Sequence, residues 1–126
     1  VLRIKLNHID KFNDSRKKIA HQYNDEINNP NIKAPSINKN FDHVFHQYTI
    51  LANNREDLQT YLYENGVSSA IYYPIPIHKQ NVYKSSHENV VLTNAEDVAK
   101  KCLSLPIYPE LKSSDVSYIA NLLNKF

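Results

Sequence analysis

Apolar residues recur every three or four positions along residues 2–27, and charged residues lie between them. This spacing puts the apolar side chains on one face, so we expect an amphipathic helix of about 26 residues, roughly 40 Å long. Its apolar face consists of Leu2, Leu6, Ile9, Phe12, Ile19, Tyr23 and Ile27. A compact domain of this size does not need so long a helix, so we expect its first half to pack against something outside this chain. The sequence contains no methionine and opens within this pattern, which we interpret as a piece of a longer polypeptide.

The polar stretch 28–40 predicts an irregular connection after this helix. Beyond it, segments rich in β-branched, aromatic or apolar residues predict three strands, at residues 43–51, 67–73 and 103–108. In the first of these strands, alternation should place Val44, His46, Tyr48 and Ile50 on one face.

Three further helices are expected, at about residues 54–66, 93–102 and from 113 onward. The first should end at Gly66 in the left-handed conformation. The order of helices and strands predicts an α/β sandwich, in which a small sheet carries helices on one face. The expected N-caps are Asn54, Thr93 in a capping box with Glu96, and Ser113 or Ser114.

Composition narrows the classes of function. The net charge of +2 is small, and lysines and arginines are spread along the chain, so we expect no dedicated nucleic-acid or membrane surface. No apolar run approaches the ~20 residues that span a bilayer. The single cysteine, Cys102, excludes an internal disulfide framework and is typical of a reducing compartment, so we expect a cytoplasmic protein. The single glycine disfavours a phosphate-binding loop or dinucleotide fold within this chain.

Histidine, cysteine and tyrosine offer candidate chemistry. His43 and His46 should point to opposite faces of a strand with no acidic cluster nearby, so hydrogen-bonded structural histidines are a better interpretation than a metal site. Cys102 has apolar neighbours and is expected to be a small buried hydrophobe rather than a nucleophile. The nine tyrosines could form an RNA-stacking surface, but the candidate strands carry no Arg or Lys between their aromatic residues.

The stretch 70–80, AIYYPIPIHKQ, concentrates tyrosine, proline and histidine. Pro74 and Pro76 fix φ, and each biases the residue before it towards an extended conformation. We therefore expect a stiff, non-helical segment that presents His78 and Gln80, whose donors and acceptors suit a hydroxyl-rich ligand. From these residues alone, a binding segment and a structural loop remain equal alternatives.

The motifs YYPIPIHKQNVY, LSLPIYPEL and VSYIANLL, in this order, resemble the C-terminal domain of the DegT/DnrJ/EryC1/StrS family of sugar aminotransferases. Upstream, VLRIKLNHIDKFNDSRKKIAHQY resembles the long helix that links the large and small domains of that family. The resemblance implies the small domain of the aspartate-aminotransferase (fold type I) fold, with a mostly antiparallel sheet. It assigns residues 1–28 to the inter-domain helix and residues 29–126 to the small domain.

The resemblance implies that the complete protein uses pyridoxal phosphate (PLP) to transfer an amino group, usually from glutamate, to a nucleotide-linked keto sugar. Such a reaction belongs to polysaccharide or glycan biosynthesis. The family's cofactor-binding groups belong to the large domain, and the surroundings of Lys79 do not match the family's lysine motif. We therefore expect PLP to be bound outside this chain, and the chain alone to be inactive. The family also implies a homodimer.

In the family, the small domain closes one side of the active site. The resemblance assigns Tyr72, Tyr73 and His78 to the wall of the sugar-nucleotide pocket, with His46 and Tyr48 nearby. A proline-braced segment loses little entropy when it holds these side chains in place, which suits a role in substrate orientation.

Arg55 matches a recurrent arginine of the family, for which we favour a structural ion pair or cap. The alternative function, a free-standing small-ligand or RNA-binding module, and a remnant enzyme that acts through protein contacts are both still open on the sequence.

Overall fold

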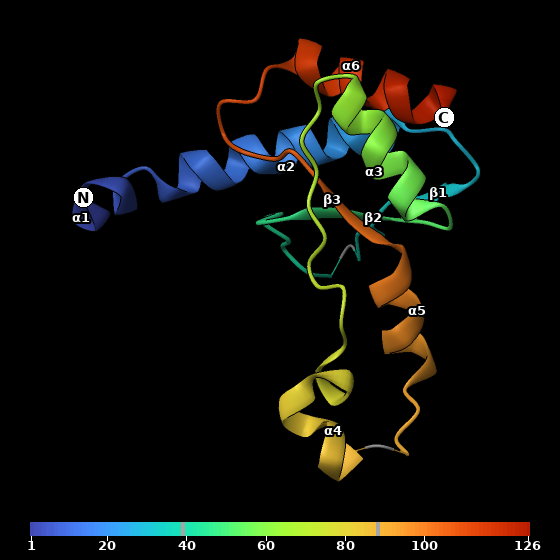
Figure 1. Ribbon diagram of the computed structural model, residues 1–126. Coiled ribbons are helices and arrows are strands. Elements are labelled where there is room, and N and C mark those ends of the chain that lie inside the picture. Colours follow the sequence, from blue (N-terminus) through green and yellow to red (C-terminus); the bar gives the residue numbers. More distant parts are fainter. Residues whose placement is uncertain (39, 88) are drawn as a thin grey trace.

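The computed structural model describes residues 1–38, 40–87 and 89–126. Three antiparallel strands and the helices that surround them make up the chain (Figure 1). The elements are α1 (Leu2–Leu6), α2 (Ile9–Glu26), β1 (Ile32–Lys33), β2 (Tyr48–Ala52), α3 (Arg55–Glu64), the 3-10 helix η1 (Ile77–Lys79), α4 (Asn81–His87), α5 (Thr93–Lys101), β3 (Cys102–Leu105) and α6 (Ser113–Lys125). No helix in these described ranges is both long enough and apolar enough to cross a membrane.

The sheet has the order β1-β2-β3, and both pairings are antiparallel. In the register, Ile32 lies opposite Ala52, and Tyr48 lies opposite Leu105. Helices α2, α3 and α6 lie on one side of the sheet (Figure 1). The core between these layers contains Ile19, Ala20, Tyr23, Ile50, Leu58, Leu62, Leu103, Val116, Ile119 and Leu123. The predicted α/β class, with a small antiparallel sheet and helices on one face, is confirmed.

The predicted strand 67–73 is reduced to a single bridge, in which Ala70 and Ser104 exchange backbone hydrogen bonds of 3.1 and 2.7 Å. The next donor needed on one side would be the N–H of residue 106, which is a proline and has none. On the other side, the N–H of Cys102 already donates to Val98 O at the end of α5. Neither neighbouring pair can therefore exchange both of the hydrogen bonds that Ala70 and Ser104 exchange.

The predicted strand 43–51 is wrong in its first half, because β2 begins only at Tyr48. Phe45 has a φ of 50°, in the left-handed region, and its N–H donates to His43 Nδ1 at 3.0 Å. This turn breaks the alternation, so Val44 and His46 are exposed whereas Tyr48 and Ile50 are buried. The four residues do not share one face.

The predicted helix 2–27 is divided into α1 and α2. At the division, the N–H groups of Asn7 and His8 donate to the carbonyls of Ile4 and Lys5, three residues back, at 3.2 and 3.0 Å. No residue of α1 is buried, so no tertiary packing favours a continuous helix there. The second half is anchored by Ile19 and Tyr23 in the core, as the apolar spacing predicts.

Two of the predicted N-caps are wrong, because each helix begins slightly earlier than expected. Helix α5 has Leu92 at its N-cap, and the Leu92 N–H donates to Glu96 Oε1 at 3.1 Å, so Thr93 does not serve as the cap. Helix α6 has Lys112 at its N-cap. The N-cap at Asn54 is confirmed in position, although its side chain makes no capping hydrogen bond. Gly66 has a φ of 76°, as expected for a left-handed stop.

Residues 71–101 leave the sheet at the Ala70 bridge and return to it where α5 runs into β3; we call them the arm. Figure 1 shows α4 and α5 extending away from the helical side of the sheet. Pro76 is extended, with φ −63° and ψ 150°, as its sequence context predicts. The prediction of a wholly non-helical segment is wrong, because η1 begins directly after Pro76 and α4 follows it.

Candidate functional site

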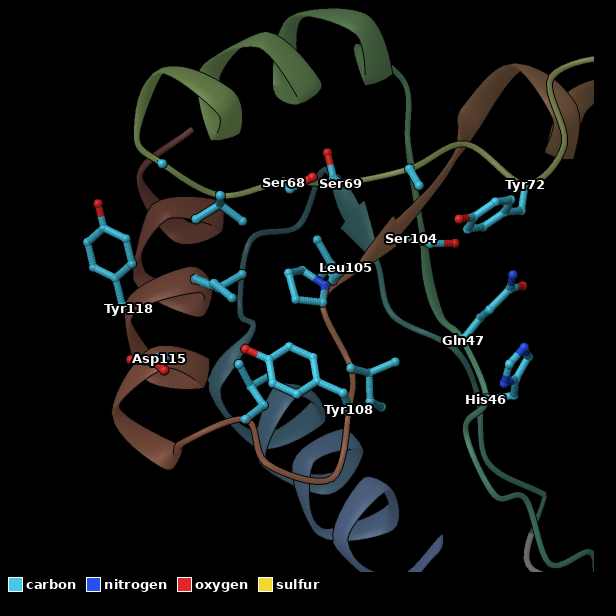
Figure 2. A pocket seen from close by; sticks show the side chains of 17 residues that line it. His46, Gln47, Ser68, Ser69, Tyr72, Ser104, Leu105, Tyr108, Asp115 and Tyr118 are labelled. Atoms are coloured by element: carbon cyan, nitrogen blue, oxygen red, sulfur yellow. The ribbon is translucent and has the colours of Figure 1, made fainter. Parts of the chain in front are cut away.

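A hollow of about 660 Å³ opens on the edge of the sheet where β3 ends. We call it the serine hollow because Ser68, Ser69 and Ser104 line it. Its other lining residues are His46, Gln47, Gly66, Val67, Ala70, Tyr72, Leu105, Pro106, Ile107, Tyr108, Leu111, Asp115, Tyr118 and Ile119. In Figure 2, Tyr72, Gln47 and His46 lie on one side, Tyr108, Asp115 and Tyr118 lie on the other, and Ser104 and Leu105 lie between them.

The hydroxyl groups of the serine hollow differ in how far they are engaged. Ser104 is buried, and its Oγ lies 2.8 Å from Thr49 Oγ1 in a hydrogen bond that either group can donate. The Tyr118 hydroxyl donates to Asn65 O at 3.1 Å. Ser69 Oγ is buried, and within the described residues it has no hydrogen-bond partner. Because this oxygen is covered by protein atoms, Ser69 lines the hollow with its other atoms and does not present its hydroxyl to it.

A second hollow, of about 950 Å³, lies inside the arm between η1, α4 and α5, and we call it the arm hollow. Tyr72 lines both hollows, so the two meet at its ring. The Tyr72–Tyr73 peptide bond is cis, and the two rings pack edge to face with centroids 5.7 Å apart. Much of the lining is apolar, and its polar contributors include His78, Gln80 and Asn94.

His78 is buried, with an exposed fraction of 7%. Its Nε2 lies 3.0 Å from Oε1 of Glu96, in the first turn of α5. Lys79 Nζ lies 3.7 Å from the same carboxylate oxygen and donates to Val90 O at 3.2 Å. The hydrogen bond with His78, followed by that from the Leu92 N–H, holds the pKa of the Glu96 carboxyl below its ordinary value. The carboxylate therefore stays charged and ties η1 to α5.

The structure brings four of the five predicted site residues to the two hollows. His46 and Tyr72 line the serine hollow, and Tyr72, Tyr73 and His78 line the arm hollow. Tyr48 lies in the core instead, where its hydroxyl donates to Asn24 Oδ1 at 2.6 Å and burial raises its pKa. Tyr48 therefore supports the wall behind His46 and does not line either hollow.

Two other residues singled out from the sequence have structural roles. Arg55 is buried, donates from Nη1 to Ala99 O at 2.8 Å and pairs with Glu56, so the prediction of a structural role is confirmed. Cys102 is buried as predicted, at the point where α5 passes into β3.

Sequence reasoning did not assign Ser69, Ser104 or Asp115 to a site, and it gave Glu96 only a capping role. The pattern gave a signal for two of these residues. Ser104 lies within the quoted LSLP motif, and Glu96 is the acidic residue of the proposed capping box. No local pattern marks Ser69 or Asp115, which reach the hollow only through the tertiary fold.

The fold and the hollows define a small α/β domain with two hollows that both border Tyr72. The profile of the DegT/DnrJ/EryC1/StrS aminotransferase family matches residues 1–124, and the chain belongs to this family. The family match favours the predicted aminotransferase family over the alternative of a small-ligand or RNA-binding module.

Three curated relatives match nearly the whole chain. The "Pleiotropic regulatory protein" of Geobacillus stearothermophilus is 37% identical over 130 residues, covering 100% of this chain and 35% of the relative. The UDP-N-acetyl-3-dehydro-alpha-D-glucosamine 3-aminotransferase of Acidithiobacillus ferrooxidans is 34% identical, covering 99% and 34%. The dTDP-3-amino-3,6-dideoxy-alpha-D-galactopyranose transaminase of Aneurinibacillus thermoaerophilus is 33% identical, covering 100% and 34%.

Solved structures agree with this assignment. DesV of S. venezuelae, in complex with a ketimine intermediate, superposes with a TM-score of 0.94 at 30% identity, covering 99% of this chain and 34% of DesV. NtdA of Bacillus subtilis, with bound cofactor PMP, superposes with a TM-score of 0.78 at 28% identity, covering 91% and 29%. The chain thus spans about a third of the length of the relatives that it matches.

Proposed function

We propose that this chain is the C-terminal part of a PLP-dependent aminotransferase that transfers an amino group, from glutamate, to a nucleotide-linked keto sugar in polysaccharide or glycan biosynthesis. The observation that carries the proposal is the family match over residues 1–124, among relatives named as nucleotide-sugar aminotransferases. In this reading, residues 1–28 form the inter-domain helix and residues 29–126 the small domain.

The residues of this chain do not fit a cofactor site of their own. Lys79 Nζ is engaged by Val90 O and lies beside Glu96, and the chain's single glycine cannot build a glycine-rich phosphate cradle. We therefore assign the cofactor-holding groups to the rest of the protein. When bound there, PLP supplies the electron sink that amino-group transfer requires.

The contribution of this chain is substrate orientation. Tyr72, Tyr73 and His78 stand along one continuous wall, since Tyr72 borders both hollows. Hydroxyls of the sugar match the polar groups of the serine hollow, which include the exposed side chains of His46 and Gln47. The nucleotide matches the aromatic and apolar arm hollow, where Tyr73 and Tyr83 offer ring surfaces. Fixing both ends of the substrate directs its keto carbon towards the cofactor.

A 3-keto sugar is the proposed substrate class. Two relatives at 33–34% identity carry position 3 of the sugar in their names. The proposed partners are the nucleotide sugar, the amino donor and a second copy of the complete protein, and the proposed compartment is the cytoplasm. The apolar residues of α1 and the start of α2, which include Leu2, Ile4 and Leu6, are exposed in this chain and offer surface for the rest of the protein or a second copy to cover.

The test uses the complete protein, reconstituted with PLP. Turnover of glutamate with UDP- and dTDP-linked 3-keto sugars, and with the corresponding 4-keto sugars, is followed by product analysis. We expect 3-keto substrates to be aminated. Absence of turnover with every nucleotide keto sugar, despite bound PLP, would overturn the proposal.

The two residues Tyr73 and His78 allow the orientation role to be tested within that protein. We expect Tyr73→Phe and His78→Ala each to raise KM for the sugar about five- to tenfold, because each variant removes about one hydrogen bond. Absorbance of the bound cofactor should not change. Tyr63→Phe is the matched control, since Tyr63 is an exposed tyrosine on α3 outside both hollows. Equal loss of sugar use and cofactor binding would indicate a structural role instead.

A further inference from the structure

Two hydrogen bonds and one longer ion pair meet at a single carboxylate oxygen of Glu96. Its Oε1 lies 3.0 Å from His78 Nε2, accepts the Leu92 N–H at 3.1 Å and lies 3.7 Å from Lys79 Nζ. Two of these groups come from η1 and the third from the N-cap of α5, so a single side chain joins the two walls of the arm hollow. The hydrogen bond from a backbone N–H fixes the carboxylate itself, which makes it a rigid partner for the imidazole.

This geometry determines which nitrogen of His78 carries the hydrogen. A charged carboxylate can only accept, so the nitrogen that faces it must be protonated. In the neutral imidazole, Nδ1 is then left with a free lone pair and acts as an acceptor. Within the described residues no hydrogen bond uses His78 Nδ1, and His78 lines the arm hollow.

We propose that Glu96 is a positioning residue that holds His78 in the Nε2–H form, so that Nδ1 accepts a hydrogen bond from a hydroxyl or ring N–H of the substrate in the arm hollow. The identity of that substrate, a nucleotide sugar, rests on the proposed function. Glu96 itself does not contact the substrate in this arrangement. It acts through the ring, in the way that carboxylates orient histidines in other sites.

Asp97 provides a matched control on the same helix. It is the next residue along α5, carries the same charge and pairs with Lys101 at 2.7 Å on the surface. Asp97→Asn removes an equal charge from α5 without touching His78. Glu96→Gln keeps the shape and the acceptor for the Leu92 N–H, but its amide can either donate to Nε2 or accept from it, so the tautomer is no longer fixed.

The first measurement reads the tautomer directly. The complete protein is labelled with ¹⁵N-histidine, and the His78 resonances are assigned by comparison with His78→Ala. We expect wild type and Asp97→Asn to show a protonated Nε2 and an unprotonated Nδ1, and Glu96→Gln to show a mixture. A wild-type His78 with Nδ1 protonated, whether alone or together with Nε2, would overturn the inference even if every variant failed to fold.

The second measurement is the KM for the nucleotide keto sugar. We expect Glu96→Gln to raise KM about five- to tenfold with little change in kcat, and Asp97→Asn to change neither. Equal KM values for the two variants in an active enzyme would contradict the positioning role and leave the proposed function intact. A protein inactive on every keto sugar that still shows the Glu96-dependent tautomer would instead contradict the proposed function alone.

Discussion

Two tyrosines, Tyr23 and Tyr48, stack in the centre of the core with ring centroids 4.8 Å apart. The Tyr23 hydroxyl donates to Pro106 O at 3.0 Å, and the Tyr48 hydroxyl donates to Asn24 Oδ1 at 2.6 Å. Burial raises the pKa of both phenols, so they remain neutral donors in the physiological range. These residues hold α2, β2 and the segment directly after β3 together.

Tyr48 allows a test that separates support from substrate contact. Tyr48→Phe keeps the ring and leaves Asn24 Oδ1 without its donor, so we expect the free energy of unfolding to fall by about 1 kcal/mol. Sugar KM in the complete protein should stay unchanged. The comparison is Tyr72→Phe, whose ring is half-exposed. For this variant we expect a raised KM for the sugar and an unchanged free energy of unfolding. Denaturant unfolding and steady-state kinetics check both, and a raised KM for Tyr48→Phe would restore Tyr48 to the site.

At the scale of elements, α3 and α5 are joined through one buried guanidinium. Arg55 Nη1 donates to Ala99 O, in the last turn of α5, at 2.8 Å. Nη2 of the same guanidinium pairs with the carboxylate of Glu56, whose side chain is largely exposed. The hydrogen bond from Arg55 gives Ala99 O, at the end of the helix, a stronger donor than the Cys102 thiol, which lies 3.9 Å from the same oxygen.

We expect Arg55→Ala to lower the free energy of unfolding by about 1.5–3 kcal/mol, since it removes a charge-assisted hydrogen bond from a buried carbonyl. Glu56→Gln should change it by no more than about 1 kcal/mol, because an exposed ion pair contributes little. Thermal or denaturant unfolding of the two variants in parallel checks the contrast. Similar losses for both would mean that the ion pair, rather than the tie to α5, stabilises the junction.

The elements also show where sequence patterns succeed and where they fail. Helical spacing identifies the buried residues of α2, α3 and α6, because each packs one apolar face on the same sheet. The predicted strand at 67–73 is wrong because its hydrogen bonds depend on the neighbouring strand β3. There, Pro106 has no N–H to donate, and the N–H of Cys102 already donates within the end of α5. The family motif singles out Tyr72, Tyr73 and His78, which line the two hollows. It does not single out Ser69, whose place in the lining follows from the tertiary fold, which no local pattern encodes.

For the whole molecule, the ion-paired carboxylate of Glu96 links stability to pH. The pKa of Glu96 is lowered from an ordinary value of 4.5, chiefly by the hydrogen bond with His78. A carboxyl with a lower pKa in the folded than in the unfolded state stabilises the fold above the unfolded value. That contribution is lost as the pH falls below about 4.5 and through the folded pKa.

We therefore expect the unfolding midpoint of wild type to decrease between about pH 5 and pH 3, and Glu96→Gln to reduce this decrease. Asp97→Asn serves as the comparison, because its carboxylate pairs with Lys101 on the surface rather than with η1. Denaturant midpoints across this range give the measurement. An unchanged acid dependence in Glu96→Gln would show that the contact with His78 does not contribute to stability.

The single bridge between Ala70 and Ser104 brings the two ends of the arm together and so affects how freely its length can change. The arm leaves and rejoins the sheet at almost the same place, with Ala70 bridged to Ser104 and β3 starting at Cys102. Because the two ends of the arm are adjacent, a change in its length alters the entropy of loop closure only slightly. The core layers of α2, α3 and α6 lie outside it. Changes of length before α5 therefore cost little closure entropy, whereas α5 itself has to keep its position because Arg55 of α3 donates to Ala99 O.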